Sequence, residues 1–222
     1  MKNKLIYRLT LFLVALVIFT GCAFSLGGIR GSGVFKTDSR EVTTFSSISF
    51  KSVGKLKVLQ NGKESLTIIA EDNILPILKS HVSDKTLYIN NVNESSINST
   101  KPIEFVVEVR NLENLAAKAV GSIEVNGIQG KRLSVSLDGV GSMAIAGNVD
   151  VLELELIGVG SFDGQALKAK QALVRNKGVG SAVVNVSEQL NASVSGLGSI
   201  EYVGSPQVTE SVKGLGGIKK RS

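Results

Sequence analysis

The sequence predicts an all-β protein whose larger part is a parallel β-helix, a solenoid in which short strands stack coil upon coil. Three observations lead to this fold class. The chain has no tryptophan, 3 prolines, 24 glycines and only 5% aromatic residues, so its core must consist mainly of Val, Ile, Leu and Ala, which favours strands. A glycine-containing unit recurs at a short interval. Apolar and polar residues alternate on both sides of that unit.

The repeated unit sets the architecture. After residue 111 the units AVGS, GVGS, GVGS, GVGS, GLGS and GLGG follow one another at spacings of 20, 19, 20, 18 and 18 residues. Helical repeats need more than about 30 residues and a propeller blade needs about 40, so both are excluded. A leucine-rich repeat has this length, but its asparagine signature is missing. We expect regular coils of about 18–20 residues over residues 111–218, and a less regular part of the same domain over residues 43–110.

The residues around the glycines predict inward columns, because period-two alternation gives each strand one buried face. One residue after each unit recurs as an apolar position: Ile123, Met143, Phe162, Ala182, Ile200 and Ile218. The residues before the unit also match from coil to coil: Leu133, Val135 and Leu137 with Leu152, Leu154 and Leu156, and with Leu190, Ala192 and Val194. Asn176 and Glu210 interrupt these columns, so either a coil is irregular there or Asn176 stacks its amide inside.

The glycine pair itself predicts a tight corner, where glycine permits positive φ and the close approach of the neighbouring coil. The second glycines, which we take as the structural turn residues, are Gly121, Gly141, Gly160, Gly180, Gly198 and Gly216. We expect the small apolar residue between the two glycines to point into the core. These residues are Val120, Val140, Val159, Val179, Leu197 and Leu215.

The part of the sequence before residue 111 predicts further strands and two local features. The segment QNGK, between alternating residues around 56–58 and 66–68, predicts a hairpin turn. The segment ILPILKS, residues 74–80, predicts a short helix capped by Asp72 or Asn73.

The first 21 residues predict a signal peptide of the lipoprotein type. A basic start, MKNKLIYR, precedes the apolar stretch LTLFLVALVIFT, which is too short for a comfortable spanning helix. The segment IFTGC is similar to the bacterial lipoprotein signal, although Phe19 stands where leucine is usual. The alternative is an ordinary secretory leader, but a single thiol in an exported chain has no disulfide partner. We predict lipid attachment at Cys22, and a flexible tether over residues 22–42.

The charge does not indicate a nucleic-acid partner. The formal net charge is +6, but Lys2, Lys4 and Arg8 in the leader supply three of these charges, which leaves +3 for the rest. The remaining lysines and arginines are dispersed and are not interleaved with aromatic residues, so we expect no nucleic acid to bind.

A family resemblance rests on several segments together. GGIRGSG, REVTTFSSISF, IEFVVEV, the row of GVGS units, and the ending GSIEYVGSPQV followed by GLGGI resemble the head-GIN-type putative autotransporter adhesin family. The resemblance covers nearly everything after the leader. It implies a right-handed single-stranded parallel β-helix in a cell-surface or periplasmic setting, and it supplies no catalytic residues.

Candidate chemistry on the scaffold is sparse. His81 is the only histidine, and we expect a solvated or capping role for it. Glu153 and Glu155 share the outward face of one predicted strand at about 6 to 7 Å, but charge on a solvent face is the simpler interpretation. Glu124, Asp163 and Glu201 share an outward column interrupted by Ala144 and Val183, which is too dilute for calcium. We therefore expect no cofactor, no metal and no enzyme activity.

The function that the sequence favours is that of a lipid-anchored envelope protein. We expect it to lie at the outer membrane, facing the periplasm or the surface, and to bind a glycan or an envelope protein with its repetitive faces. Two alternatives stay open: a polysaccharide-active enzyme on the same scaffold, and an envelope-assembly or stress-related lipoprotein without an external ligand.

Overall fold

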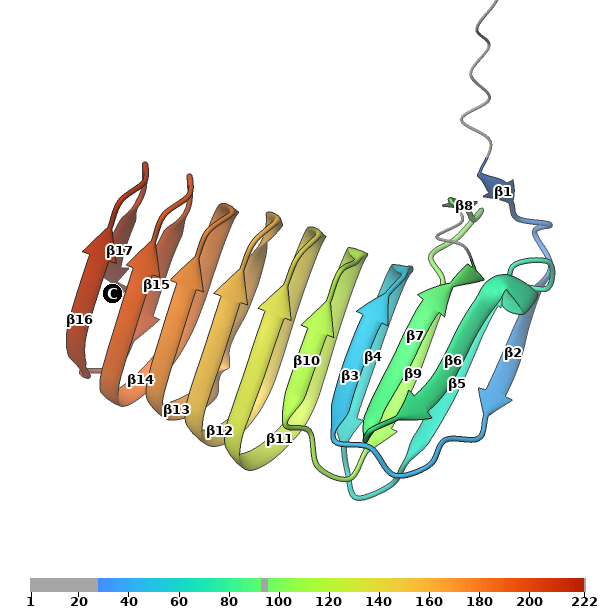
Figure 1. Cartoon of the computed structure of the whole chain (residues 1–222), viewed down its shortest axis with the longest axis horizontal. Coiled ribbons are helices and arrows are strands. Elements are labelled where there is room, and N and C mark those ends of the chain that lie inside the picture. Colours follow the sequence, from blue (N-terminus) through green and yellow to red (C-terminus); the bar gives the residue numbers. More distant parts are fainter. Residues whose placement is uncertain (1–27, 93–95, 222) are drawn as a thin grey trace, which may run out of the picture.

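The computed structural model describes residues 28–92 and 96–221, so the predicted signal peptide and Cys22 lie outside the described residues. Figure 1 shows strands stacked as a parallel β-solenoid, which confirms the predicted fold class. The element η1 (Leu75–Ile77) is a short 3₁₀ helix. The strands are β1 (Ile29–Arg30), β2 (Phe35–Arg40), β3 (Ser47–Lys51), β4 (Val53–Gln60), β5 (Ser65–Glu71), β6 (Leu78–Ser83), β7 (Thr86–Asn91), β8 (Ile97–Asn98), β9 (Glu104–Val109), β10 (Asn114–Ala117), β11 (Val120–Leu137), β12 (Val140–Leu156), β13 (Val159–Asn176), β14 (Val179–Val194), β15 (Ser199–Val203), β16 (Gln207–Val212) and β17 (Gly217–Lys220).

Each long strand makes most of one coil. In Figure 1, β11 to β14 each run from an upper corner down one wall, round a lower bend and up the opposite wall. Successive strands pair in parallel, with Val120 opposite Val140 and Leu137 opposite Leu156. The register of β11 against β12 shifts between Val125 and Ile128, close to the bend. The unequal coil lengths are therefore absorbed at the bends, while the walls stay in register.

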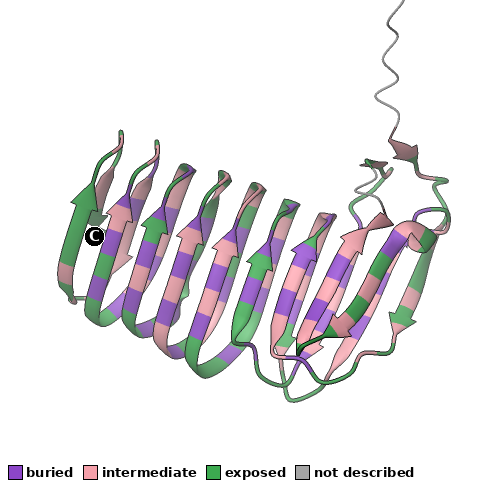
Figure 2. Cartoon of the chain, viewed as in Figure 1, coloured by how far each residue is buried: buried purple, intermediate pink, exposed green. Residues whose placement is uncertain are grey.

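The predicted inward columns are confirmed. Ile123, Met143, Phe162, Ala182 and Ile200 pair in sequence from coil to coil, and each is at most 3% exposed. Figure 2 shows the alternation as buried bands that repeat along the strands. The walls therefore enclose a continuous apolar core, whose burial is the main favourable term in folding.

Asn176 stacks its amide inside the core. Of the two alternatives, an irregular coil or an interior amide, the second is therefore correct. Its side chain is 1% exposed, and it occupies the position of Leu156 one coil later. The amide nitrogen donates to the carbonyl oxygen of Gly180 (3.1 Å), and the amide oxygen accepts from the N–H of Gly178 (3.2 Å). The cost of burying this polar group is thus offset by hydrogen bonds at the corner. Glu210, on β16 in the last coils, is exposed instead.

The N-terminal part extends both walls with strands of mixed direction. On one wall β7 pairs in parallel with β3 and antiparallel with β6. On the other wall β9 pairs in parallel with β4 and antiparallel with β5, and β5 pairs with β2. Phe50 of β3 and Phe105 of β9 meet edge to face, with ring centroids 5.1 Å apart, and both are fully buried. This aromatic contact joins the two walls in the N-terminal part of the core.

Two local predictions for this part are wrong. The QNGK segment does not close a hairpin, because β9 lies between β4 and β5 and pairs with both. The predicted helix over residues 74–80 is reduced to η1, and its N-cap is Ile74 without a side-chain cap. The chain leaves the helix at Leu78 because β6 obtains its backbone hydrogen bonds from β7.

The predicted tether does not extend over residues 29–40. β1 pairs with β8, and β2 pairs with β5 along its whole length. The guanidinium of Arg40 also donates to the carbonyl oxygens of Leu78 (2.8 Å) and Leu75 (3.3 Å). Partners distant in the sequence therefore order a segment that has no apolar periodicity of its own.

Glu71 holds residues 29–40, which we call the entry segment, from inside the fold. Its side chain is fully buried, and its carboxylate accepts hydrogen bonds from the hydroxyls of Ser99 (2.5 Å) and Thr100 (2.7 Å) and from the backbone N–H of Gly33 (2.8 Å). Burial raises the pKa of Glu71, but these hydrogen bonds outweigh it and lower the pKa to about 2. The charged carboxylate therefore joins the entry segment, β5 and the loop after β8.

Acid is expected to loosen this junction before the solenoid. The pKa of Glu71 is about 2 in the fold and 4.5 ordinarily, so its stabilising effect is complete above about pH 4.5 and is lost as the pH falls towards 2. Hydrogen-exchange protection factors of the Gly33 and Thr100 amides should fall in this window, while those in β12 and β13 persist. Glu71→Gln should lower the same protection factors at neutral pH. Unchanged protection at Gly33 and Thr100 in both experiments would contradict this role.

Candidate binding surfaces

The glycines predicted as turn residues stand in one row along the corners, each against the preceding coil. A Cβ on Gly121 would overlap the carbonyl oxygen of Gly54, and the same overlap with the glycine one coil earlier recurs at each member of the row. Gly180 also has a φ of 146°, which side-chain-bearing residues rarely adopt. Close stacking of the corners therefore requires glycine. The row is Gly121, Gly141, Gly160, Gly180, Gly198 and Gly216.

The residue between the two glycines points outward, so the predicted inward orientation is wrong. Val159 is 53% exposed, and the equivalent Val140 is 54% exposed. Strand alternation continues through the corner: Gly158 and Gly160 have the same parity as the buried Leu156 and Phe162. Glycines occupy the inward positions because a Cβ there would overlap the backbone of the preceding coil. The valine between them is thereby directed to the surface.

These outward residues form one continuous apolar row, which we call the corner row. Val53, Val120, Val140, Val159 and Val179 are paired in register. Two further residues extend the row, since their amides donate to the carbonyl oxygens of the preceding corner as that of Val179 does. The members are Val53, Val120, Val140, Val159, Val179, Leu197 and Leu215.

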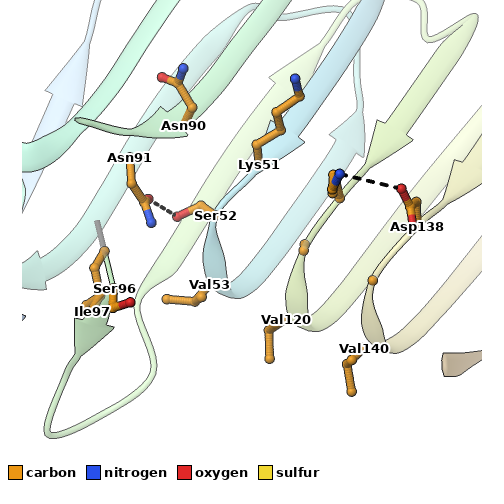
Figure 3. Close-up of a pocket in the computed structure, with 13 residues that line it drawn as sticks. Lys51, Ser52, Val53, Asn90, Asn91, Ser96, Ile97, Val120, Asp138 and Val140 are labelled. Carbon is orange, nitrogen blue, oxygen red and sulfur yellow. Dashed lines mark hydrogen bonds and ion pairs between the residues drawn. The ribbon is translucent and has the colours of Figure 1, made fainter. Parts of the chain in front are cut away.

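A shallow depression of about 580 Å³ lies at the first corners, beside the corner row. Figure 3 shows Val53, Val120 and Val140 in line along one side of it, with Ile97 of β8 at its rim. Inside it the Ser52 hydroxyl donates to the Asn91 side chain (2.7 Å). Its lining is therefore mixed, with apolar residues next to amide and hydroxyl groups.

The bends at the opposite end of the coils carry polar residues, which we call the polar row. Gln129, Asn148, Lys168 and Asn185 are paired from coil to coil. They line a depression of about 350 Å³. An ion pair between Asp150 and Lys170 (2.8 Å) lies at the same depression, and its hydrogen bond raises the pKa of Lys170.

The polar row was not predicted from the sequence. Its members recur once per coil, so aligning the units beyond the glycines would have found them, but their polar types vary. Glu71 was also missed, because a single glutamate at the end of an alternating strand gives no sign that it is buried.

The carboxylates considered for chemistry are engaged by cations. Glu153 pairs with Arg132 (3.1 Å), and Glu155 pairs with Lys177 (2.5 Å). These are exposed pairs between neighbouring coils, and such pairs contribute little individually. His81 is exposed and stacks on the ring of Tyr88, with centroids 5.0 Å apart.

The structure also places the outward acidic column as expected. Glu124, Ala144, Asp163, Val183 and Glu201 pair in that order, so uncharged residues separate the carboxylates. Lys55 binds Glu124 (2.7 Å). Within residues 28–92 and 96–221, no group of three or more His, Cys, Asp or Glu has a geometry able to hold a metal ion.

The stacked walls, glycine corners and shallow outer depressions define a β-solenoid whose exposed features are rows along its faces. Residues 44–206 match the family described as putative auto-transporter adhesin, head GIN domain. The chain belongs to that family, as its sequence motifs predicted.

Solved structures share this fold. A putative adhesin from Bacteroides fragilis is 27% identical, with a TM-score of 0.70 over 87% of this chain and 100% of that one. A putative lipid binding protein from Parabacteroides distasonis shares the fold at 20% identity, with a TM-score of 0.51 over 87% of this chain and 99% of that one. No curated protein matches the chain. Within the described residues, no helix has the length and apolar character to cross a bilayer.

Neighbouring residues of one corner should respond oppositely to substitution. Gly160→Ala puts a methyl group onto the Gly141 carbonyl oxygen and should cost about 2–3 kcal/mol of unfolding free energy. Val159→Asp changes an exposed side chain and should cost less than about 1 kcal/mol. Urea unfolding followed by circular dichroism measures both. Gly130→Ala, whose Cβ meets nothing closer than 3.9 Å, is the control. A larger loss at Val159 than at Gly160 would contradict the corner geometry.

Proposed function

We propose that the chain is a lipid-anchored protein of the bacterial cell envelope that binds a partner with the outer surface of its solenoid. Membership of the adhesin family supports an extracellular or envelope setting. The basic start, the apolar residues 9–20 and the Gly21–Cys22 pair support export and lipid attachment at Cys22. Each buried methylene contributes about 0.8 kcal/mol, so several acyl chains anchor a protein stably. The outer membrane is the proposed location, with the domain facing the periplasm or the surface.

The observation that carries the binding role is the polar row at the bends. Gln129, Asn148 and Asn185 bring amide groups to one edge, and Lys168 adds a cation. Amides both donate and accept hydrogen bonds, which suits the hydroxyl groups of a glycan. The depression that they line is shallow and extends over four successive coils, so a linear polymer lying along the row fits it better than a compact small molecule.

No specific observation favours a polysaccharide-active enzyme. Such an enzyme needs two carboxyl groups, or a base and a nucleophile, facing the substrate across a groove. Among the described residues, Glu153 and Glu155 are held by Arg132 and Lys177, and His81 stacks on Tyr88.

Fractionation of cells tests the anchor. The wild-type chain should stay with the membranes after an alkaline wash and incorporate labelled fatty acid, and Cys22→Ala should incorporate none, because the substitution removes the acylated thiol. Cys22→Ser is a second variant that changes only one atom of the side chain. Incorporation of labelled fatty acid by both variants at the wild-type level would contradict lipid attachment at Cys22.

A glycan array probed with the purified chain tests the binding role. Gln129→Ala with Asn148→Ala should weaken the strongest signal by about tenfold, because two hydrogen-bonding groups are lost. Gln189→Ala with Gln207→Ala is the matched control, since these exposed amides pair on another column. Binding confined to envelope proteins would replace the glycan. No binding at all, together with an envelope defect on deletion, would favour the assembly role.

A further inference from the structure

The corner row is an exposed apolar surface that the fold does not need. Val53 is half-buried and packs against the core, but the later members lie largely in solvent: Val120 and Val140 are 54% exposed, Leu197 is 58% exposed and Leu215 is 78% exposed. At about 4.8 Å per coil, the seven residues extend over about 29 Å. A contiguous exposed apolar feature of this kind marks an interaction surface more often than an isolated exposed valine does.

Lysines accompany the corner row on one side. The residues two positions before the corner residues form a second column. Its backbone amides donate to the preceding coil: that of Lys118 to the carbonyl oxygen of Phe50, and that of Lys177 to the carbonyl oxygen of Leu156. The side chain of Lys118 is 71% exposed, and its ammonium nitrogen lies 3.9 Å from the carboxylate of Asp138. Ile157 in the same column is 42% exposed and widens the apolar surface. The column is Lys51, Lys118, Asp138, Ile157, Lys177, Ser195 and Lys213. An apolar strip edged with lysines is complementary to a bilayer with anionic headgroups.

The chain enters the domain beside the same corners. β1 pairs with β8, and Ile97 of β8 borders the depression that Val53, Val120 and Val140 also line (Figure 3). Figure 1 shows β1 and β8 at the upper edge, where the corners lie, and the bends at the lower edge. Gly28 is six residues after Cys22, a stretch that spans at most about 20 Å. An anchor at Cys22 would therefore keep the corner row within reach of the bilayer.

We propose that the corner row is a membrane-contacting edge, which lies on the surface of a bilayer bearing anionic headgroups. The valines and leucines enter the interfacial region, and Lys51, Lys118 and Lys213 lie over the headgroups. The polar row then faces away from the bilayer. This inference rests on the proposed function in placing the N-terminal segment in the membrane, and it adds an orientation that an anchor alone does not impose.

The test uses the full chain with Cys22→Ala, so that it does not depend on lipid attachment. The apolar N-terminal segment stays in place, and a single new cysteine carries an environment-sensitive fluorophore, at Val120→Cys on the corner row or at Gln129→Cys on the polar row. Each labelled chain is bound to vesicles of phosphatidylcholine with phosphatidylglycerol, or of phosphatidylcholine alone. The Val120 label should shift to shorter wavelengths and be quenched by spin-labelled lipid on the anionic vesicles, and the Gln129 label should not.

Matched substitutions show whether the row itself makes the contact. Val140→Thr, Val159→Thr and Val179→Thr together keep the shape of the corners, and they should lower the quenched fraction of the Val120 label by about tenfold. Val106→Thr, Val151→Thr and Val183→Thr are the control, because these valines are half-buried on the walls, away from the corners. The control should leave quenching unchanged.

Three outcomes would overturn the membrane-contacting edge. They are equal quenching at Val120 and Gln129, quenching unaffected by the corner substitutions, and a shift at Val120 that appears without vesicles and grows with protein concentration. The last would identify the row as an interface between two copies of the chain. Because every labelled chain lacks Cys22, these results are separate from the fractionation test: lipid anchoring can fail while the corner row still contacts vesicles, and the reverse.

Discussion

The corner glycines of successive coils stack so closely that a Cβ on any of them would overlap the carbonyl oxygen of the glycine one coil earlier. A Cβ at Gly160 would overlap the oxygen of Gly141, and a Cβ at Gly180 would overlap that of Gly160. This approach lets the two walls meet at a narrow corner while their strands stay in register. The coils differ in length, and the additional residues lie at the bends, where the register between neighbouring coils shifts.

The same contact sets the chemistry of the two edges. Because glycines hold the inward positions at the corner, the residue between them has only the outward direction, and an apolar row results. The bends carry amides, a lysine and the Asp150–Lys170 ion pair. One edge is therefore apolar and the other polar, which gives the solenoid two binding surfaces of different character along one axis.

The sequence predicted the repeated part well and the irregular part poorly. The columns from Ile123 to Ile200 follow from period-two alternation, because each coil repeats the same local pattern. The partners of β5 do not follow in this way: β9 and β2 are far from the QNGK turn, and only tertiary packing selects them. The orientation of Val159 was missed because an apolar residue was assumed to be internal, although its position is of opposite parity to that of the buried Phe162. The burial of Glu71 depends on hydroxyl and amide donors from two other segments, and no local pattern contains them.

The central claim is that the corners are rigid stacking points despite their exposed valines, and native-state hydrogen exchange tests it most directly. The amides of Val140, Val159 and Val179 donate to the carbonyl oxygens of Ala119 (3.0 Å), Gly139 (2.8 Å) and Gly158 (3.0 Å). The account predicts that these three amides exchange only through global unfolding, with the same free energy as amides in the middle of the walls. Exchange at nearly the rate of an unfolded chain, while the wall amides stay protected, would contradict it.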